Sequence, residues 1–548
     1  MYYLQGGVKL NVSFDAQTSP YPAKRNVVYG KRGMVATSQP LAAEAGLDIL
    51  KKGGNAIDAA IATAACLTVV EPTSNGIGSD SFAIVWVDGE LYGLNGSGAA
   101  PEALSIEALR EAGYQGEMPE LGVVPVTVPG TPGAWAELSR RFGKLPLTEV
   151  LAPAIDYAEH GFPLSPTLAK NWEKAFNNYS NQLKGEEFVA WFETFAPNGV
   201  APKAGEMWSS PDHARTLRSI AETEATSFYN GELADQIDDF FRKHGGFLRK
   251  RDLASYKPEW VTPIKINYRG YDVWEIPPNG SGIVALKALN ILKGFEFTEK
   301  ESVDTYHKQI EAMKLALTDG MMYVADSGRM TVPVEALLSD EYAEERRKLI
   351  GEKALVPEPG TPPKGGTVYL ATADGMGNMV SFIQSNYMGF GSGIVVPGTG
   401  IAMQNRGHNF SLDPIHCNAL TAGKRPYHTI IPGFLTKEGE AVGPFGVMGG
   451  FMQPQGHVQV IMNSIDFSLN PQAALDAPRW RWIKDKTVEV ERHLPDHIVL
   501  DLVRKGHDIK ISIDGAPFGK GQIIWRDPKT GVLAGGTESR ADGHIAVW

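Results

Sequence analysis

Hydrophobic positions near the N-terminus first repeat at helical spacing and then run together as a strand. Residues 41–52 carry apolar side chains three and four positions apart, and Gly53 follows as a helix C-terminal cap. Residues 55–69 open a second, alanine-rich helix, and the continuous apolar run at 82–87 is typical of a buried strand. The alternation predicts an α/β block over residues 26–100.

Two changes of pattern follow. Residues 105–350 show mostly helical spacing, as at 151–160 and 303–326, and hold few residues typical of a reaction centre. Residues 350–366 are rich in proline, glycine and lysine, which predicts an exposed linker.

Directly after this linker the pattern predicts a β-hairpin. Residues 368–372 and 379–385 form its strands, and 374–378 its turn. Pairing outward from this turn places Thr367 across from Ser385, and directly opposed Cβ atoms are about 5 Å apart. The sequence therefore predicts a second hydroxyl beside Thr367, although a one-residue slip of the register would separate the two.

Composition and charge exclude several classes of function. The chain has 548 residues, 43% of them hydrophobic, and a net charge of -11 without a long basic run, so nucleic acid is not an expected partner. No stretch approaches 18 apolar residues without a charge, so we expect no membrane span. Residues 1–9 lack the pattern of a secretory signal, and the cytoplasm is the expected compartment. With only Cys66 and Cys417 there is no disulfide framework, and Cys66 is expected to be a small buried residue.

Thr367 is the strongest candidate for chemistry. A threonine hydroxyl needs a base within hydrogen-bond reach, and an N-terminal α-amine with a pKa of about 7.7 can serve. That arrangement requires cleavage of the Gly366–Thr367 bond, after which Thr367 is nucleophile and carries its own base. The alternative is an ordinary threonine at the start of a strand, a position that threonine favours.

Gly449 and Gly450 could point bare backbone N–H groups at a developing oxyanion, although an isolated glycine pair is more often a tight turn. The sequence contains no His-Glu-x-x-His motif and no paired Cys or His at ligand spacing, so we expect neither a metal nor a cofactor. His408 and His416 are interpreted as ordinary polar residues.

Jointly, several motifs resemble the γ-glutamyltranspeptidase family of N-terminal nucleophile hydrolases, in particular its lid-less, cephalosporin (glutaryl) acylase-like branch. The resemblance runs from about Gly30 to Trp548. It rests on Gly53-Gly54-Asn55-Ala56-Ile57-Asp58-Ala59-Ala60, Gly366-Thr367, Gly389-Phe390-Gly391-Ser392-Gly393, Lys424-Arg425-Pro426, Gly449-Gly450 and Asn463-Ser464-Ile465-Asp466.

The resemblance implies an α/β fold, a four-layer αββα sandwich. It implies a large subunit, 1–366, and a small subunit, 367–548, produced by self-cleavage and kept together as a heterodimer, with a higher oligomer left open. It also implies Thr367 as nucleophile, Ser385 in the place of an assisting second threonine, and Gly449-Gly450 as oxyanion hole.

The departures from the family pattern concern the substrate's amino-acid head group. Ser97 stands where the family has an arginine for the α-carboxylate, and Asn409 where it has an acid for the α-amine. Arg406 replaces a Gln or Glu, and could hold a carboxylate or be a surface residue. His428-Thr429 replaces a pair of serines.

The charge partners of a zwitterionic head group are therefore missing from their usual places. Charge-assisted contacts contribute about 1.5–3 kcal/mol each, enough to reorder substrate preference. We also expect Asn405 to be a pocket residue and Arg540 to be either a substrate contact or a structural ion pair.

The leading hypothesis is a self-processing amidase that cleaves γ-glutamyl or glutaryl amides through an acyl-Thr367 intermediate. The short segment 411–423 suggests an open site that admits water and favours hydrolysis over transfer. One alternative is an authentic glutathione hydrolase or γ-glutamyltransferase with a different head-group grip. A second is an unprocessed protein that only binds a ligand.

Overall fold

The computed structural model describes residues 25–357 and 366–548. The prediction for residues 1–9, and the part of the linker prediction that covers 358–365, lie outside the described residues. The expected N-terminal α/β block is confirmed. It comprises α1 (Pro40–Lys51), α2 (Ala56–Val70), β3 (Asp80–Val87) and β4 (Glu90–Gly96).

Local chemistry fixes the two helices where the sequence predicts them. The Gln39 side chain accepts hydrogen bonds from the first backbone N–H groups of α1, and Gly53 after its end has a φ of +100°. Asn55 and Asp58 form a reciprocal capping box at the start of α2. All fifteen residues of α2 are buried, including Cys66, so this helix lies inside the molecule rather than on it.

Two seven-stranded antiparallel sheets form the middle of the protein. The first has the order β1-β20-β19-β15-β14-β9-β8 and the second β21-β2-β10-β11-β3-β4-β7. The strands of the first are β1 (Val28–Gly30), β20 (Leu533–Thr537), β19 (Lys520–Arg526), β15 (Glu440–Met448), β14 (Gly433–Lys437), β9 (Tyr271–Glu275) and β8 (Ile264–Tyr268). The second adds β21 (His544–Val547), β2 (Gly33–Thr37), β10 (Gly366–Asp374), β11 (Met379–Tyr387) and β7 (Glu259–Val261).

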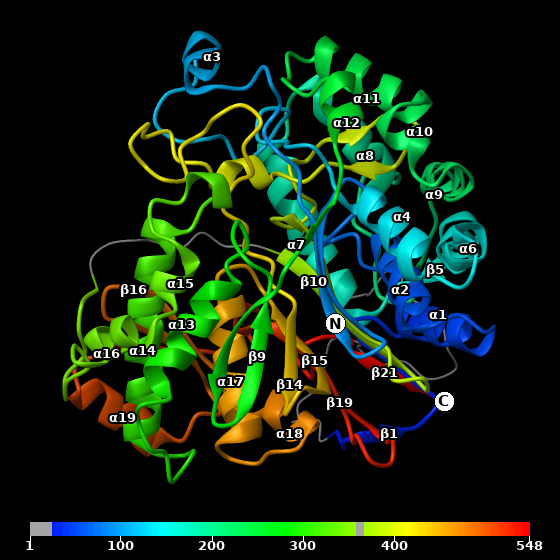
Figure 1. Cartoon of the computed structure of the whole chain (residues 1–548). Coiled ribbons are helices and arrows are strands. Elements are labelled where there is room, and N and C mark those ends of the chain that lie inside the picture. The colour runs from blue at the N-terminus through cyan, green and yellow to red at the C-terminus, as the bar shows by residue number, and fades with distance from the viewer. Residues whose placement is uncertain (1–24, 358–365) are drawn as a thin grey trace, which may run out of the picture.

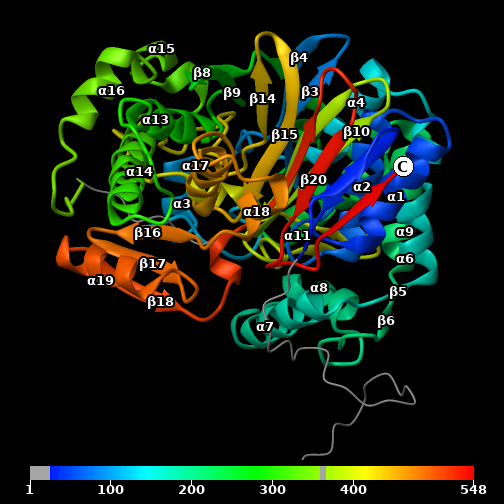
Figure 2. The same cartoon turned by 90° about the horizontal axis from the view of Figure 1, so that it is seen from below.

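Helices cover the outer face of each sheet. α1 and α2 pack on β2, β10 and β11, while α13 (Gly282–Leu292), α17 (Met452–Ile465) and α18 (Pro471–Asp476) pack on the other sheet. Strands β10 and β15 face each other between them (Figure 2). The layer order is therefore αββα, as expected from the resemblance.

The remaining elements surround this sandwich (Figure 1). α14 (Val303–Tyr323) packs against α13, and β16 (Trp480–Lys484), β17 (Thr487–Glu491) and β18 (Asp508–Ser512) form a small sheet with α19 (Asp496–Arg504) beside it. The other helices are α3 (Ile106–Glu111), α4 (Thr131–Phe142), α5 (Leu147–Val150), α6 (Ala152–His160), α7 (Pro166–Gln182), α8 (Val189–Phe195), α9 (Pro211–Thr223), α10 (Thr226–Tyr229), α11 (Glu232–Lys243), α12 (Lys250–Ser255), α15 (Val334–Leu337) and α16 (Asp340–Arg347). The short strands are β5 (Phe162–Pro163), β6 (Met207–Trp208), β12 (Val395–Val396) and β13 (Ile401–Ala402).

The middle of the chain is mostly helical, as predicted, but it also supplies strands to both sheets. β7 is the edge of one sheet and β8–β9 the edge of the other. The alternation of Ile264, Ile266 and Tyr268 with polar residues carries this strand signal. None of the described helices has the length and apolar composition needed to cross a membrane.

The predicted hairpin is confirmed in its register. Ala373 pairs with Met379 and Val368 with Gln384, as the turn requires. The register shifts between Gly366 and Val368, so Thr367 lies at a β-bulge at the very start of β10. Tyr387, the partner of Gly366 on β11, adopts a φ of +76°, a strained conformation for a side chain of this size.

Candidate active site

Thr367 is the second residue of β10 and is only 3% exposed. Its Oγ1 lies 3.2 Å from Ser385 Oγ, so the hydroxyl predicted beside it is present. Gln453, in the first turn of α17, donates from Nε2 to Thr367 Oγ1 at 3.3 Å, and its Oε1 accepts from the Ile431 N–H at 3.0 Å. Thr367 Oγ1 thus contacts Ser385 on β11 of its own sheet and Gln453 on α17, the helix that packs on the other sheet.

Gly449 and Gly450 join the end of β15 to the start of α17. Their φ angles are +138° and +61°, a region that favours glycine. Their carbonyls accept from the N–H groups of Met452 and Gln453, at 3.1 Å each. Among the described residues, neither glycine N–H has an acceptor, which is the state needed for binding an oxyanion.

A cavity of about 390 Å³ opens at Thr367. Thr367, Met448 and Gly449 form part of its wall, together with Met388 and Lys520. The facing wall is one side of α7, contributing Asn171, Lys174, Ala175, Asn178, Tyr179 and Gln182. The candidate nucleophile and one candidate oxyanion donor therefore share a single cleft.

Arg406 lies behind Thr367 and is fully buried, so it is not a surface arginine. Its Nη1 donates to Thr429 Oγ1 at 2.8 Å and its Nη2 to Ser385 Oγ at 3.0 Å. The guanidinium carbon lies 4.6 Å from the centre of the Tyr387 ring. Burial lowers the pKa of Arg406 to about 10, against the opposing charge of Asp80. Its cation thus acts on the candidate nucleophile through Ser385.

His428 is also buried and pairs with an acid. Its Nε2 lies 3.1 Å from Asp80 Oδ2, and its Nδ1 accepts from the Ile430 N–H at 3.4 Å, so Nε2 carries the proton. Burial and the Arg406 charge lower the pKa of His428 well below its usual value. Burial raises the pKa of Asp80 to about 7, although Arg406 opposes that effect. His428 is therefore neutral at physiological pH.

The two predicted asparagines bridge backbone segments. Asn405 accepts from the Met388 N–H at 3.3 Å and donates to the Glu120 carbonyl at 2.9 Å. Asn409 donates to the Tyr427 carbonyl at 3.0 Å. Both hold the walls of the site in place, and the cleft itself is lined by other residues.

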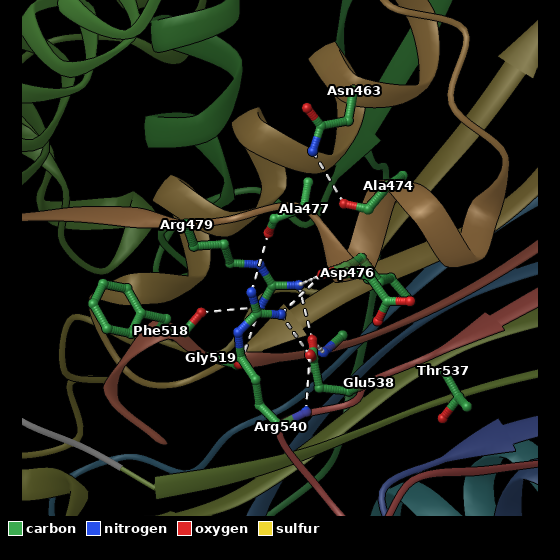
Figure 3. A network of polar contacts seen from close by, with 12 residues as sticks. Asn463, Ala474, Asp476, Ala477, Arg479, Phe518, Gly519, Thr537, Glu538 and Arg540 are labelled. Atoms are coloured by element: carbon green, nitrogen blue, oxygen red, sulfur yellow. Dashed lines mark hydrogen bonds and ion pairs between the residues drawn. The ribbon is translucent and has the colours of Figure 1, made fainter. Parts of the chain in front are cut away.

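Arg540 belongs to a buried ion-pair network rather than to the cleft (Figure 3). It contacts Glu491 and Glu538, and its remaining donors reach the carbonyls of Leu475 and Ala477. Arg479 pairs with Glu538 from the other side at 2.8 Å. Because every donor nitrogen of Arg540 is engaged, a substrate-binding role does not fit this geometry, and the structural ion pair does.

Sequence spacing gave no sign of a buried cluster formed by His307, Glu311 and His507. His307 Nδ1 lies 2.8 Å from His507 Nε2, and Glu311 accepts from the Lys314 ammonium at 2.7 Å. These residue types can ligate metals, but Lys314 already supplies the cation that compensates the carboxylate. His307 also contacts the Gly351 carbonyl at 2.8 Å, so the cluster holds the beginning of the predicted 350–366 linker in place.

Two elements of the site escaped sequence reasoning. α7 comes from the segment that was expected to carry little chemistry, and the amides of Asn171, Asn178 and Gln182 at helical spacing were its available signal. Gln453 follows the glycine pair by three residues in the sequence, and in the structure it contacts Thr367 Oγ1 directly.

This chain resembles known proteins over nearly its whole length. The family model described as gamma-glutamyltranspeptidase matches residues 42–548. The chain is 36% identical over 531 residues to the glutathione hydrolase-like YwrD proenzyme of Bacillus subtilis (strain 168), covering 94% of this chain and 98% of that protein. It is 34% identical over 559 residues to the acylase ACY 1 proenzyme of Pseudomonas sp. (strain SE83), covering 97% and 99%.

A solved structure, the cephalosporin acylase from Bacillus halodurans, superposes with a TM-score of 0.96 at 69% identity, covering 98% of this chain and 99% of that one. The fold is thus that of the N-terminal nucleophile hydrolases, and the protein is an enzyme of the hydrolase and acyltransferase class. More narrowly, the chain belongs to the gamma-glutamyltranspeptidase family.

Proposed function

We propose that this chain is a proenzyme that cleaves its own Gly366–Thr367 bond and then hydrolyses small amides through an acyl-Thr367 intermediate. One observation carries the proposal: Thr367 starts a central strand, contacts a second hydroxyl and opens onto the same cleft as Gly449. Residues 1–366 then form the large subunit and 367–548 the small one. Relatives named as proenzymes support this reading.

In this mechanism the freed α-amine of Thr367 takes the proton of its own hydroxyl as Oγ1 attacks the amide carbon. The N–H groups of Gly449 and Gly450 hold the oxyanion that forms. The C–N bond then breaks, and the α-amine returns its proton to the leaving amine. Water attacks the acyl-Thr367 ester in the same way, releasing the acid and the free Thr367 hydroxyl.

The acyl group is proposed to be glutaryl or γ-glutamyl, with glutaryl preferred. Asn409 gives no negative charge to an α-ammonium, and the nearby Arg406 cation disfavours one. Binding the head group would require Arg406 to exchange its contact with Thr429 for a substrate carboxylate. An acylase and a glutathione hydrolase-like protein among the relatives fit these two substrate classes.

A second candidate, an authentic glutathione hydrolase or γ-glutamyltransferase, is favoured by Glu120. This acid lines the cleft at Thr367 and offers a carboxylate to an α-ammonium from another side. Glutaryl-4-nitroanilide and γ-glutamyl-4-nitroanilide share a leaving group and differ only in the α-amine of the acyl group. Comparing their turnover distinguishes the two candidate functions. Faster turnover of the γ-glutamyl substrate, lost in Glu120→Gln, would establish the second candidate.

Maturation is tested by intact mass on freshly purified protein. We expect two chains, the smaller beginning at Thr367, and activity toward one of the two anilides. Thr367→Ala should remain a single chain and be inactive, while Thr367→Ser, which keeps a hydroxyl, should still be cut. A Thr367→Ala protein that still matures would mean that the cleavage site lies elsewhere. A wild-type chain that stays whole and inactive would favour a ligand-binding role.

A further inference from the structure

Helix α7 presents a polar stripe to the cleft. Asn171, Lys174, Asn178 and Gln182 follow one another at intervals of three and four, so they lie on one face of the helix. At a rise of about 1.5 Å per residue the stripe is about 16 Å long. This length is far greater than that of the scissile amide, so the stripe extends the cleft beyond Thr367, which lines the same cavity.

The charge on this stripe is uncompensated. Lys174 is exposed and makes no ion pair with any described residue, and the positions three and four before and after it are Lys170, Asn171, Asn177 and Asn178. An acid at any of these positions could pair with the lysine, and none is present. By contrast Lys170, one turn earlier, approaches Asp514 at 3.9 Å and lies outside the cleft lining.

The other cation in the cleft is less available. Lys520 is largely buried, and its Nζ lies 3.8 Å from Glu71 Oε1. Glu120 is an acid in the lining, and the Asn405 side chain holds its backbone carbonyl. Lys174 is therefore the cation in the described cleft lining that a ligand can reach without breaking an existing ion pair.

We propose that the α7 stripe is the subsite for the leaving amine and that it selects amines bearing a carboxylate. Lys174 binds that carboxylate, and the amide side chains of α7 bind the other polar groups of the leaving amine. Ser385 and the buried Arg406 approach Thr367 Oγ1 from the side away from the cleft, so in this proposal the acyl side of the substrate points toward them and the leaving side toward α7. This inference rests on the proposed function for the identity of the reaction, but not for the binding itself.

The first experiment compares two glutaryl amides that share the acyl group and differ only in the leaving amine. One releases 4-aminobenzoate and the other its uncharged isostere 4-aminobenzamide. We expect Lys174→Met to lower kcat/KM for the 4-aminobenzoate substrate roughly three- to tenfold, mostly through KM, since partly exposed charge pairs are of that strength. The 4-aminobenzamide substrate should change by less than about twofold. Lys170→Met, the matched control on the same helix, should change neither.

The second experiment measures binding without turnover. In the full-length Thr367→Ala chain, titration calorimetry with 4-aminobenzoate and 4-aminobenzamide should show tighter binding of the carboxylate, and Lys174→Met should remove the difference. If the amides are not hydrolysed but this binding difference is seen, the subsite stands and the proposed reaction falls. Equal binding of the two amines, or an equal loss for both in Lys174→Met, would overturn the subsite.

Discussion

The Arg406 cation is expected to keep the N-terminal amine of mature Thr367 in its free-base form. The contacts from Arg406 Nη2 to Ser385 Oγ, 3.0 Å, and from there to Thr367 Oγ1, 3.2 Å, bring the guanidinium close to the amine of the same threonine. A nearby positive charge disfavours the ammonium form and lowers the amine's pKa. Because the amine must be neutral to act as base, activity should rise with pH through that pKa.

The size of this effect follows from Coulomb's law. At about 8 Å and an effective dielectric constant of about 20, two unit charges interact by roughly 2 kcal/mol, or about 1.5 pKa units. Asp80 offsets part of this field, but burial raises its pKa to about 7, so it is only partly ionised in the relevant range. His428 adds no charge because its pKa is held well below the usual value. A net shift of about 0.5–1.5 units is expected.

The assay is the pH dependence of kcat/KM, measured on matured protein from pH 5 to 10 with a single chromogenic amide. Arg406→Gln should shift the acidic limb of the profile to higher pH by about 0.5–1.5 units, and should lower activity at pH 7 more than at pH 9. Arg406→Lys, which keeps the charge, and Thr429→Val, which removes only the partner of Nη1, should leave the limb in place. An unmoved limb in Arg406→Gln would refute the electrostatic role.

Three further changes test other parts of the site. Ser385→Ala should lower kcat about 10- to 100-fold and slow maturation, while Ser381→Ala on the same strand should do neither; equal losses would point to strand damage. Gly449→Ala should lower kcat about 10²-fold or more, since its φ of +138° suits glycine and the added Cβ meets Gly519, and a variant of normal activity would remove it from the oxyanion hole. Burial alone would raise the pKa of Glu538, but Arg479 and Arg540 lower it to about 2, so Glu538→Gln should cost about 3 kcal/mol at pH 7. The folded-state pKa is depressed, so this contribution is complete above pH 5 and declines toward pH 2; thermal melts should show the wild type's advantage shrinking by more than half at pH 3, and an advantage independent of pH would contradict the linkage.

The hairpin that carries Thr367 could be predicted because its register depends on local chemistry. The five-residue turn at 374–378 fixes which residues pair, and pairing carries Ser385 to Thr367 without any knowledge of the rest of the fold. The bulge at Thr367 could not be predicted in the same way. It coincides with the positive φ of Tyr387, whose ring packs against the guanidinium of Arg406, a residue distant in sequence.

Contacts between distant segments were beyond sequence reasoning. The sequence around Arg540 fits either a substrate contact or a structural ion pair. Its contacts with distant residues, such as Glu491 49 positions away, decide for the ion pair. The same holds for α7, whose amides read as an ordinary solvated helix face until the fold places them opposite Gly449. Motif residues locate the chemistry, whereas the walls of the cleft depend on tertiary packing.

The interleaving of strands has a consequence for how the protein folds and persists. Both sheets combine strands from before and after position 366: β2, β3, β4 and β7 flank β10 and β11 in one, and β8 and β9 extend β14 in the other. Before cleavage, these long-range pairings form within one chain and cost only loop-closure entropy. After the proposed cleavage at Gly366–Thr367, the same pairings would have to form between two separate molecules, so recovery from the unfolded state would become bimolecular and slower on dilution. Self-cleavage would then act as a one-way step, and the lifetime of the mature enzyme would be set by its unfolding barrier rather than by an equilibrium.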